Sequence, residues 1–248
     1  MNLNLHGKRA AVAASSTGLG FACAAALAAE GAQVAICALD EREVEATVTK
    51  LGGDAVGLAV DLSSPDECER FVVDARDRLG GLDILVTNGP GPRPGTFAES
   101  DPSGYQTALE LNLLSVVRMC YAAVPQMQAQ GWGRVVAITS IAVRQPIPNL
   151  ILSNTARAGA TGFLKTLARE VAQHGVTVNS VQPGLHETER VTAVYQRDLA
   201  DQVAQIPART LGQPADFGAI VAFLCSEQAR YITGAALPID GGLDQGLL

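Results

Sequence analysis

The sequence predicts an α/β protein built on a doubly wound parallel sheet of about seven strands, with helices on both faces. Short apolar runs that suit buried strands alternate along the chain with longer segments whose apolar residues recur at helical spacing. The composition agrees, because 48% of the 248 residues are hydrophobic and only 4% are aromatic. Small aliphatic residues suit helices that pack closely on a parallel sheet. Repeated strand–helix–strand units with right-handed crossovers build such a sheet.

The expected elements follow one another without a linker or an internal repeat, so residues 1–248 are expected to form a single domain. Strands are expected at residues 10–14, 33–38, 55–60, 84–87, 135–139, 176–181 and 236–239. Helices are expected at residues 19–30, 41–51, 64–79, 105–130, 153–173 and 216–225. Ligands bind beyond the carboxyl ends of the strands in such sheets, so the segments that follow the strands are expected to carry the site.

Charge and cysteine content exclude several classes of function. The net charge is −7, so no basic surface is expected to attract nucleic acid or an anionic membrane. No apolar run approaches the roughly 18 residues that span a bilayer, and residues 1–8 lack the apolar stretch of a secretory signal. The scattered cysteines indicate neither disulfides nor a metal site: Cys23, Cys37, Cys68, Cys120 and Cys225. A cytoplasmic protein with a small-molecule substrate is expected.

A glycine-rich turn joins the first expected strand to the first helix, with the sequence Ala14-Ser15-Ser16-Thr17-Gly18-Leu19-Gly20. Glycines at such a turn let the backbone approach a pyrophosphate, and the helix N-terminus offers unpaired N–H groups to it. Turns of this kind also occur where a strand and a helix simply pack closely. The turn alone therefore leaves both interpretations open.

Further motifs, in the same order and spacing, resemble those of the short-chain dehydrogenase/reductase family, which has a Rossmann-type fold. The turn resembles the family motif Thr-Gly-x-x-x-Gly-x-Gly, with Ala13 and Ala14 where Thr and the first Gly usually stand. The other matches are Asp61-Leu62, Thr87-Asn88-Gly89-Pro90, Asn112 within Leu-Asn-Leu, Asn179 through Pro183-Gly184 with Thr188, Thr233-Gly234, and Asp240-Gly241-Gly242. The resemblance extends over nearly the whole chain and implies a nicotinamide-dependent oxidoreductase.

The resemblance also implies which residues contact the dinucleotide. They are Ala14, Ser16, Thr17, Gly18, Leu19, Gly20, Leu39, Asp61, Leu62, Asn88, Gly89, Arg157, Pro183, Gly184, His186 and Thr188. In the family, residues that bind the 2′-phosphate of NADP commonly stand where Thr17 and Leu39 stand here, and neither is charged. Asp40 suits either the ribose of NAD or the cap of the next helix, and Arg42 either a phosphate or solvent. The cofactor is expected to be NAD or NADP, with a slight preference for NAD.

The catalytic positions depart from the family pattern of Asn, Ser, Tyr and Lys. Asn112 and Ser140 match the first two, but alignment without gaps puts Ser153 at the tyrosine position and Arg157 at the lysine position. The Tyr-x-x-x-Lys pair is therefore absent. A serine hydroxyl is a far weaker acid than tyrosine, which titrates near ~10, and arginine stays charged and cannot relay a proton. Chemistry of the usual type then needs another proton donor.

The segment expected to cover the substrate, about residues 185–209, contains two candidates for that donor. His186 suits an acid or base near neutral pH, or else a loop side chain that points to solvent. Tyr195 is either a second donor or an aromatic cover for the substrate. Arg144 is either a binder of a substrate carboxylate or phosphate, or a surface charge. Glu187, Glu189 and Arg190 are expected to be solvated.

The leading hypothesis is a divergent oxidoreductase that transfers hydride between nicotinamide and a carbonyl or alcohol, with Ser140 polarising the oxygen. One alternative is a non-redox enzyme on the same scaffold, dehalogenase-like or lyase-like. Another is a catalytically silent protein that binds the cofactor. The resemblance also implies a homodimer or homotetramer that associates through the helices expected at 105–130 and 153–173.

Overall fold

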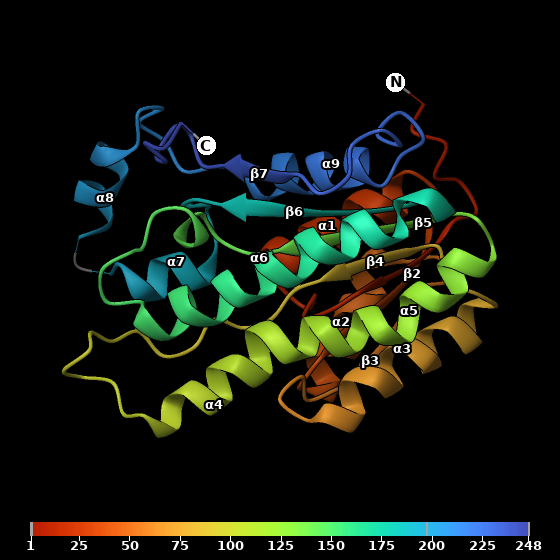
Figure 1. Ribbon diagram of the computed structural model, residues 1–248, viewed down its shortest axis with the longest axis horizontal. Helices are drawn as coiled ribbons and strands as arrows, with labels where there is room; N and C mark the ends of the chain where they lie inside the picture. The colour runs from red at the N-terminus through yellow and green to blue at the C-terminus, as the bar shows by residue number, and fades with distance from the viewer. Residues whose placement is uncertain (1, 197, 248) are drawn as a thin grey trace.

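A computed structural model describes residues 2–196 and 198–247. Within these ranges the chain forms a seven-stranded parallel sheet in the order β3-β2-β1-β4-β5-β6-β7, shown in Figure 1. The strands are β1 (Arg9–Val12), β2 (Gln33–Ala38), β3 (Val56–Ala59), β4 (Ile84–Thr87), β5 (Gly133–Ile138), β6 (Val176–Pro183) and β7 (Ala236–Ile239). The predicted doubly wound parallel sheet is confirmed.

Helices cover both faces of the sheet (Figure 1). Buried residues of α1 (Gly18–Ala29), α2 (Glu41–Leu51) and α9 (Pro214–Leu224) form one apolar core with one face. Buried residues of α3 (Pro65–Leu79), α5 (Ser115–Ala129) and α6 (Ile151–Val171) form a second core with the other. The remaining helices are α4 (Ser103–Leu109), α7 (Glu189–Val194) and α8 (Leu199–Gln205), with short turns η1 (Glu110–Leu114), η2 (Ile141–Val143) and η3 (Ala172–His174).

The predicted boundaries of four elements agree with the structure. β2, α2, β4 and β7 have the predicted bounds. α6 begins at Ile151 rather than at 153, and β6 continues to Pro183 because that residue pairs with Ile239 of β7. The segment predicted to cover the substrate contains two short helices, α7 and α8, which lie beside the carboxyl ends of β6 and β7 (Figure 1).

One helical stretch is long and apolar enough to span a bilayer, contrary to the prediction from the sequence that no segment is. Residues Ser103–Ala129 form one stretch of 27 residues that reaches that length and composition, with a mean hydropathy of 1.3 over its most apolar window. By this measure the prediction is wrong. The stretch packs against β4, β5, α3 and α6, and Met119, Ala123 and Met127 lie in the core. Its apolar face therefore serves packing within the domain.

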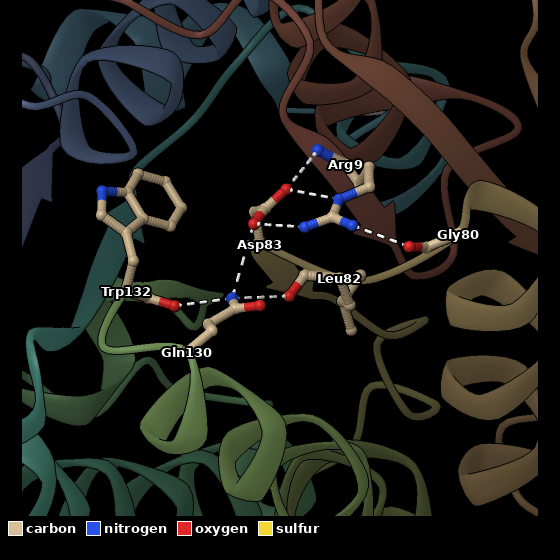
Figure 2. Close-up of polar contacts among 6 residues, drawn as sticks. All are labelled: Arg9, Gly80, Leu82, Asp83, Gln130 and Trp132. Carbon is tan, nitrogen blue, oxygen red and sulfur yellow. Dashed lines mark hydrogen bonds and ion pairs between the residues drawn. The ribbon is translucent and has the colours of Figure 1, made fainter.

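A network at the amino ends of the central strands joins β1 to β4 (Figure 2). The Arg9 guanidinium donates to both carboxylate oxygens of Asp83, through Nε at 2.7 Å and Nη2 at 2.9 Å, and Nη1 donates to the Gly80 carbonyl at 2.7 Å. Gln130 Nε2 adds bonds to the carbonyls of Leu82, at 3.1 Å, and Trp132, at 2.7 Å. Because the Asp83 side chain is only 8% exposed, its charge depends on these donors.

Asp83→Asn is expected to lower the free energy of unfolding by about 2 kcal/mol near neutral pH, since it weakens charged hydrogen bonds that are partly buried. Burial raises the pKa of Asp83, but hydrogen bonds from Arg9 outweigh it, so the net pKa lies below its ordinary value. The ionised group therefore contributes stability above the unfolded-chain pKa of about 3.9, and loses it as the pH falls through the folded-state pKa. Urea unfolding of both proteins at pH 7 and pH 3 checks this. A stability difference that persists unchanged at pH 3 would contradict it.

Candidate active site

The sheet order reverses between β1 and β4, and the loops that follow these strands separate there. Such a reversal opens a crevice beyond the carboxyl ends of the strands, which is where ligands bind in open α/β sheets. The glycine-rich turn follows β1, and the segment that begins with Asn88 follows β4. Asn88 Nδ2 donates to the Ala14 carbonyl at 2.9 Å and so links the two segments.

The glycine-rich turn has a backbone that few side chains would permit. Gly18 has a φ of +59°, and Ala14 also adopts a positive φ, of +45°. At Gly20 a Cβ would collide with the Ala14 carbonyl oxygen and lie 2.8 Å from Asn88 Nδ2. The buried Ser15 fixes the turn between two strands, because its N–H donates to Cys37 of β2 and its hydroxyl to Val12 of β1.

The N-terminus of α1 is open to a ligand. Thr17 is the capping residue, but its side chain makes no capping hydrogen bond, and the first turn contains no acidic residue. N–H groups of this turn are therefore available to an anion, and the helix dipole favours one. Thr188, which begins α7, has its Cγ2 3.7 Å from where a Cβ on Gly18 would lie, so the start of the covering segment adjoins the turn. These features fit the diphosphate of a dinucleotide.

The residues predicted to hold the adenosine half lie around the ends of β2 and β3. Leu39 is 73% exposed and leaves an apolar surface beside β2. Asp61 Oδ1 accepts from the Ser63 N–H at 2.8 Å and from its hydroxyl at 2.7 Å, and Oδ2 has no partner among the described residues. Leu62 is buried in the core, so its side chain does not line this surface.

Two acidic residues near the turn have different roles. Asp40 caps α2, since its Oδ1 accepts from the N–H groups of Arg42 and Glu43. Of the two predicted roles of Asp40, its contacts are those of the helix cap. Glu43 Oε2 accepts from the Ser16 hydroxyl at 2.8 Å and places a carboxylate against the glycine-rich turn. Sequence reasoning missed Glu43 because it lies within the helical pattern of charged residues, where a solvated face is the ordinary expectation.

Ser140 and Asn112 flank the crevice on the other side. Ser140 follows β5, and its Oγ accepts from the Ala142 N–H at 3.1 Å, which leaves the hydroxyl proton free to donate. Asn112 lies in the π-helical turn η1 and is buried. Its Nδ2 donates to the Pro90 carbonyl at 3.3 Å, whereas its Oδ1 is buried without a partner among the described atoms. A bound water or ligand would satisfy that oxygen.

Arg157 and Ser153 lie on α6 and are both buried, with exposed fractions of 9% and 8%. Arg157 Nη1 donates to the carbonyls of Ile138, at 3.0 Å, and Thr139, at 3.1 Å. Its Nη2 lies 3.4 Å from the Gly89 carbonyl. The guanidinium thereby joins the ends of β5 and β4 next to Ser140. Burial, together with repulsion from Arg190, lowers the pKa of Arg157 to about 10, so the group is cationic at neutral pH.

His186 is buried rather than directed to solvent. Its ring is 2% exposed, so the solvent-directed interpretation is wrong. The ring packs edge-on against Phe217 of α9 at 5.1 Å between centroids, and Gly212 has no room for a Cβ beside it. Burial lowers the pKa of His186, which favours the neutral ring. These contacts hold the ring in place, and the role of His186 as an acid or base stays a prediction.

The remaining predicted site residues are held by packing or by hydrogen bonds within the protein. Pro183 ends β6, and Gly184 is confined because a Cβ would lie 2.8 Å from Asp240 Cα. The Arg144 guanidinium bonds to other residues of the protein: its Nε donates to Gln182 Oε1 at 2.7 Å, and its Nη1 pairs with Asp244 at 3.5 Å. Tyr195 is half-buried at the end of α7, and burial raises its pKa.

Comparison with known proteins agrees with this geometry. A family model described as enoyl-(acyl carrier protein) reductase matches residues 13–244. The 3-oxoacyl-(acyl-carrier-protein) reductase of Vibrio cholerae is 36% identical over 241 residues, which covers 97% of this chain and 99% of that protein. The human protein named dehydrogenase/reductase SDR family member 4 is 34% identical over 244 residues, 96% of this chain and 88% of that protein.

A solved structure of L-sorbose reductase from Gluconobacter frateurii, complexed with NADPH and L-sorbose, superposes with a TM-score of 0.92 at 30% identity. The match covers 100% of each chain. The similarity thus includes the sheet, the glycine-rich turn and the segment over the site. The chain belongs to the short-chain dehydrogenase/reductase family of nicotinamide-dependent oxidoreductases.

Proposed function

We propose that this protein transfers hydride between NAD(H) and a small carbonyl or alcohol, with Ser140 as the residue that polarises the reacting oxygen. The observation that carries the proposal is the state of the Ser140 hydroxyl. Its oxygen accepts from Ala142 N–H, so its proton is available to the ligand. Ser140 also directly follows the two carbonyls that hold the Arg157 guanidinium.

The residues of the crevice divide between binding and chemistry. The glycine-rich turn and the open N-terminus of α1 hold the diphosphate, and Asp61 holds the adenine side. When bound, the nicotinamide supplies or accepts the hydride. Ser140 donates to the substrate oxygen, and the positive charge of Arg157 stabilises negative charge that develops on it. Asn112, with its unpaired Oδ1, holds a water at the inner end of the crevice.

The absence of the Tyr-x-x-x-Lys pair limits the rate of this chemistry. The Ser153 hydroxyl makes no hydrogen bond among the described residues and is a poor acid. A positioned general acid typically contributes roughly 10²–10⁴-fold to the rate. We therefore expect turnover that is slower than in relatives with the usual pair. It depends on stabilisation of the oxyanion, and solvent water supplies the proton of the alcohol product.

Charge at the glycine-rich turn supports NAD over NADP. The Glu43 carboxylate bonds to Ser16, on the side of the turn that adjoins β2 and hence the adenosine ribose. A 2′-phosphate there would meet this carboxylate, and Thr17 and Leu39 offer no compensating charge. L-sorbose reductase was crystallised with NADPH, so this preference would distinguish the two proteins.

Assembly and location are further parts of the proposal. We expect a homodimer or homotetramer that associates through α5 and α6, as the resemblance implies. Tyr121 of α5 is 73% exposed, and α6 carries small residues that permit close helix packing. A cytoplasmic location suits a protein of net charge −7 that acts on small molecules.

Saturating NADH is expected to stabilise the protein by roughly 2.7 kcal/mol at a hundred times its dissociation constant, with a smaller gain from NADPH. Glu43→Gln keeps a hydrogen-bond acceptor for Ser16 but removes the charge. The variant should bind NADPH about three- to fivefold more tightly, in line with one exposed charge, with NADH little changed. Thermal unfolding and fluorescence titration measure both cofactors. Tighter binding of NADPH than NADH by the unmodified protein would refute the preference.

Gly20→Ala is expected to weaken NADH binding, because the new methyl group would displace the Ala14 carbonyl and Asn88 from the turn. Overpacking of this kind costs about 1–3 kcal/mol. Gly162→Ala is the matched control, since that helical glycine is exposed and has nothing within 4 Å of its Cβ position. The control should bind NADH normally, because α6 packs on the face of the sheet opposite to α1 and the turn. Equal NADH affinity in both variants would count against the turn as a cofactor site.

Ser140→Ala should reduce NADH oxidation about 100-fold or more on whichever carbonyl compound of a broad panel the protein reduces, because one oxyanion donor is lost. The NADH dissociation constant should stay within twofold of its original value. Ser140→Thr, which keeps the hydroxyl, should retain more activity than the alanine variant. Stopped-flow absorbance at the nicotinamide band provides the rates. An alanine variant as fast as the original would exclude Ser140 from the chemistry.

A further inference from the structure

We propose that Arg157 and Arg190 form a site for an acidic group of the substrate, so that the protein acts on a carbonyl or alcohol that carries a carboxylate. This inference rests on the proposed function, because it concerns the substrate of the same crevice. It goes beyond that function by naming the chemical class of the substrate and the residues that select it.

Arg157 is a buried cation without an acidic partner. Arg134 and Arg157 are the buried arginines of the described chain, with exposed fractions of 2% and 9%. Arg134 has Glu227 within 3.8 Å, whereas no carboxylate of the described residues lies within ion-pair distance of Arg157. A buried charge is costly unless an opposite charge accompanies it. Among the described residues, Arg157 is therefore the buried arginine that has no acidic counterion.

The hydrogen bonds of Arg157 leave part of the guanidinium available. The group has five N–H donors, and the protein accepts three hydrogen bonds from it, all at backbone carbonyls. Nε and one N–H of Nη2 have no acceptor among the described residues. Two neighbouring N–H groups of this kind match the fork geometry with which arginine binds a carboxylate.

Arg190 approaches the same loop from α7. Its Nη2 donates to the Pro92 carbonyl at 3.0 Å and lies 2.9 Å from where a Cβ on Gly91 would be. Arg157 bonds to Gly89 of this loop, so one short segment carries both guanidinium groups. Gly91 fits here because a side chain would displace Arg190. Arg190 is exposed, as expected, and this hydrogen bond fixes its guanidinium against the loop.

Both guanidinium groups bond to carbonyls of one short loop, at Gly89 and Pro92, so their positive charges repel each other. After burial itself, the charge of Arg190 is the further cause that lowers the pKa of Arg157. A chain with 25 acidic and 18 basic residues has ample carboxylates, yet none among the described residues pairs with either group. An anion between them would relieve the repulsion and supply the missing counterion.

The position of Arg157 favours the substrate over the cofactor as the source of this anion. The diphosphate is expected at the open N-terminus of α1, after β1. Arg157 instead lies on the carbonyls of Ile138 and Thr139, directly before Ser140. The free N–H groups of Arg157 thus belong to the same edge of the sheet as Ser140, where the reacting oxygen is expected.

Calorimetric titration with malonate tests the site, in low-chloride buffer, with and without saturating NADH, and with dimethyl malonate as the uncharged counterpart. The unmodified protein should bind malonate and not the ester. Arg190→Gln should weaken malonate binding roughly tenfold or more, as for loss of a charged donor, and Arg190→Lys should recover part of the loss. Arg93→Gln, an exposed arginine of the same loop, is the matched control and should bind malonate within twofold of the original.

The outcomes separate the two proposals. Equal malonate affinity in the original protein and Arg190→Gln, or equal binding of ester and acid, would overturn the anion site. A variant that loses affinity for NADH but not for malonate would assign Arg190 to the diphosphate and also overturn it. Absence of NADH binding to the unmodified protein would defeat the proposed function. The titration without NADH would then still decide whether the two arginines hold a carboxylate.

Discussion

The guanidinium of Arg157 joins the ends of two central strands, and the carboxyl edge of the sheet depends on it. Through carbonyls of β5 and of the segment after β4, it fixes Ser140 relative to Gly89. A lysine has three donors on one nitrogen and would span fewer of these acceptors. The planar group thus suits a role in which one side chain both braces two strand ends and presents charge to the crevice.

The opposite end of the sheet is held by a different kind of pair. There Arg9 and Asp83 neutralise each other, and further donors satisfy the carboxylate. At the carboxyl edge the charge of Arg157 has carbonyl oxygens but no acid among the described residues. Protein folds tolerate an uncompensated charge mainly where function uses it. The contrast between a completed ion pair at one end and an unpaired charge at the other supports the proposed site at the carboxyl edge without reference to any relative.

Sequence reasoning predicted the fold because the fold depends on local patterns, and from the same patterns it placed the expected site beyond the carboxyl ends of the strands. Strand–helix alternation with right-handed crossovers predicts a doubly wound parallel sheet, but not the order of its strands, and the glycine-rich turn marks the start of the first helix. The contacts of His186, Glu43 and Arg190 could not be predicted in this way. Each depends on a partner far along the chain, namely Phe217, Ser16 and Pro92. The spacing of polar residues along one segment contains no information about such partners.

The residues at this edge indicate how the protein differs chemically from relatives that have a tyrosine. Arg157 stays protonated until about pH 10, His186 is enclosed against Phe217, and Ser153 is a poor acid. Arg157 and Ser153 are therefore poor sources of a proton near neutral pH. Arg157 instead places positive charge, and Ser140 a hydroxyl donor, at the edge where the substrate oxygen is expected. Fixed groups of this kind stabilise an alkoxide because they need no reorganisation as its charge develops. A substrate that brings its own carboxylate would orient itself on the same charges, so binding and stabilisation would come from one set of arginines.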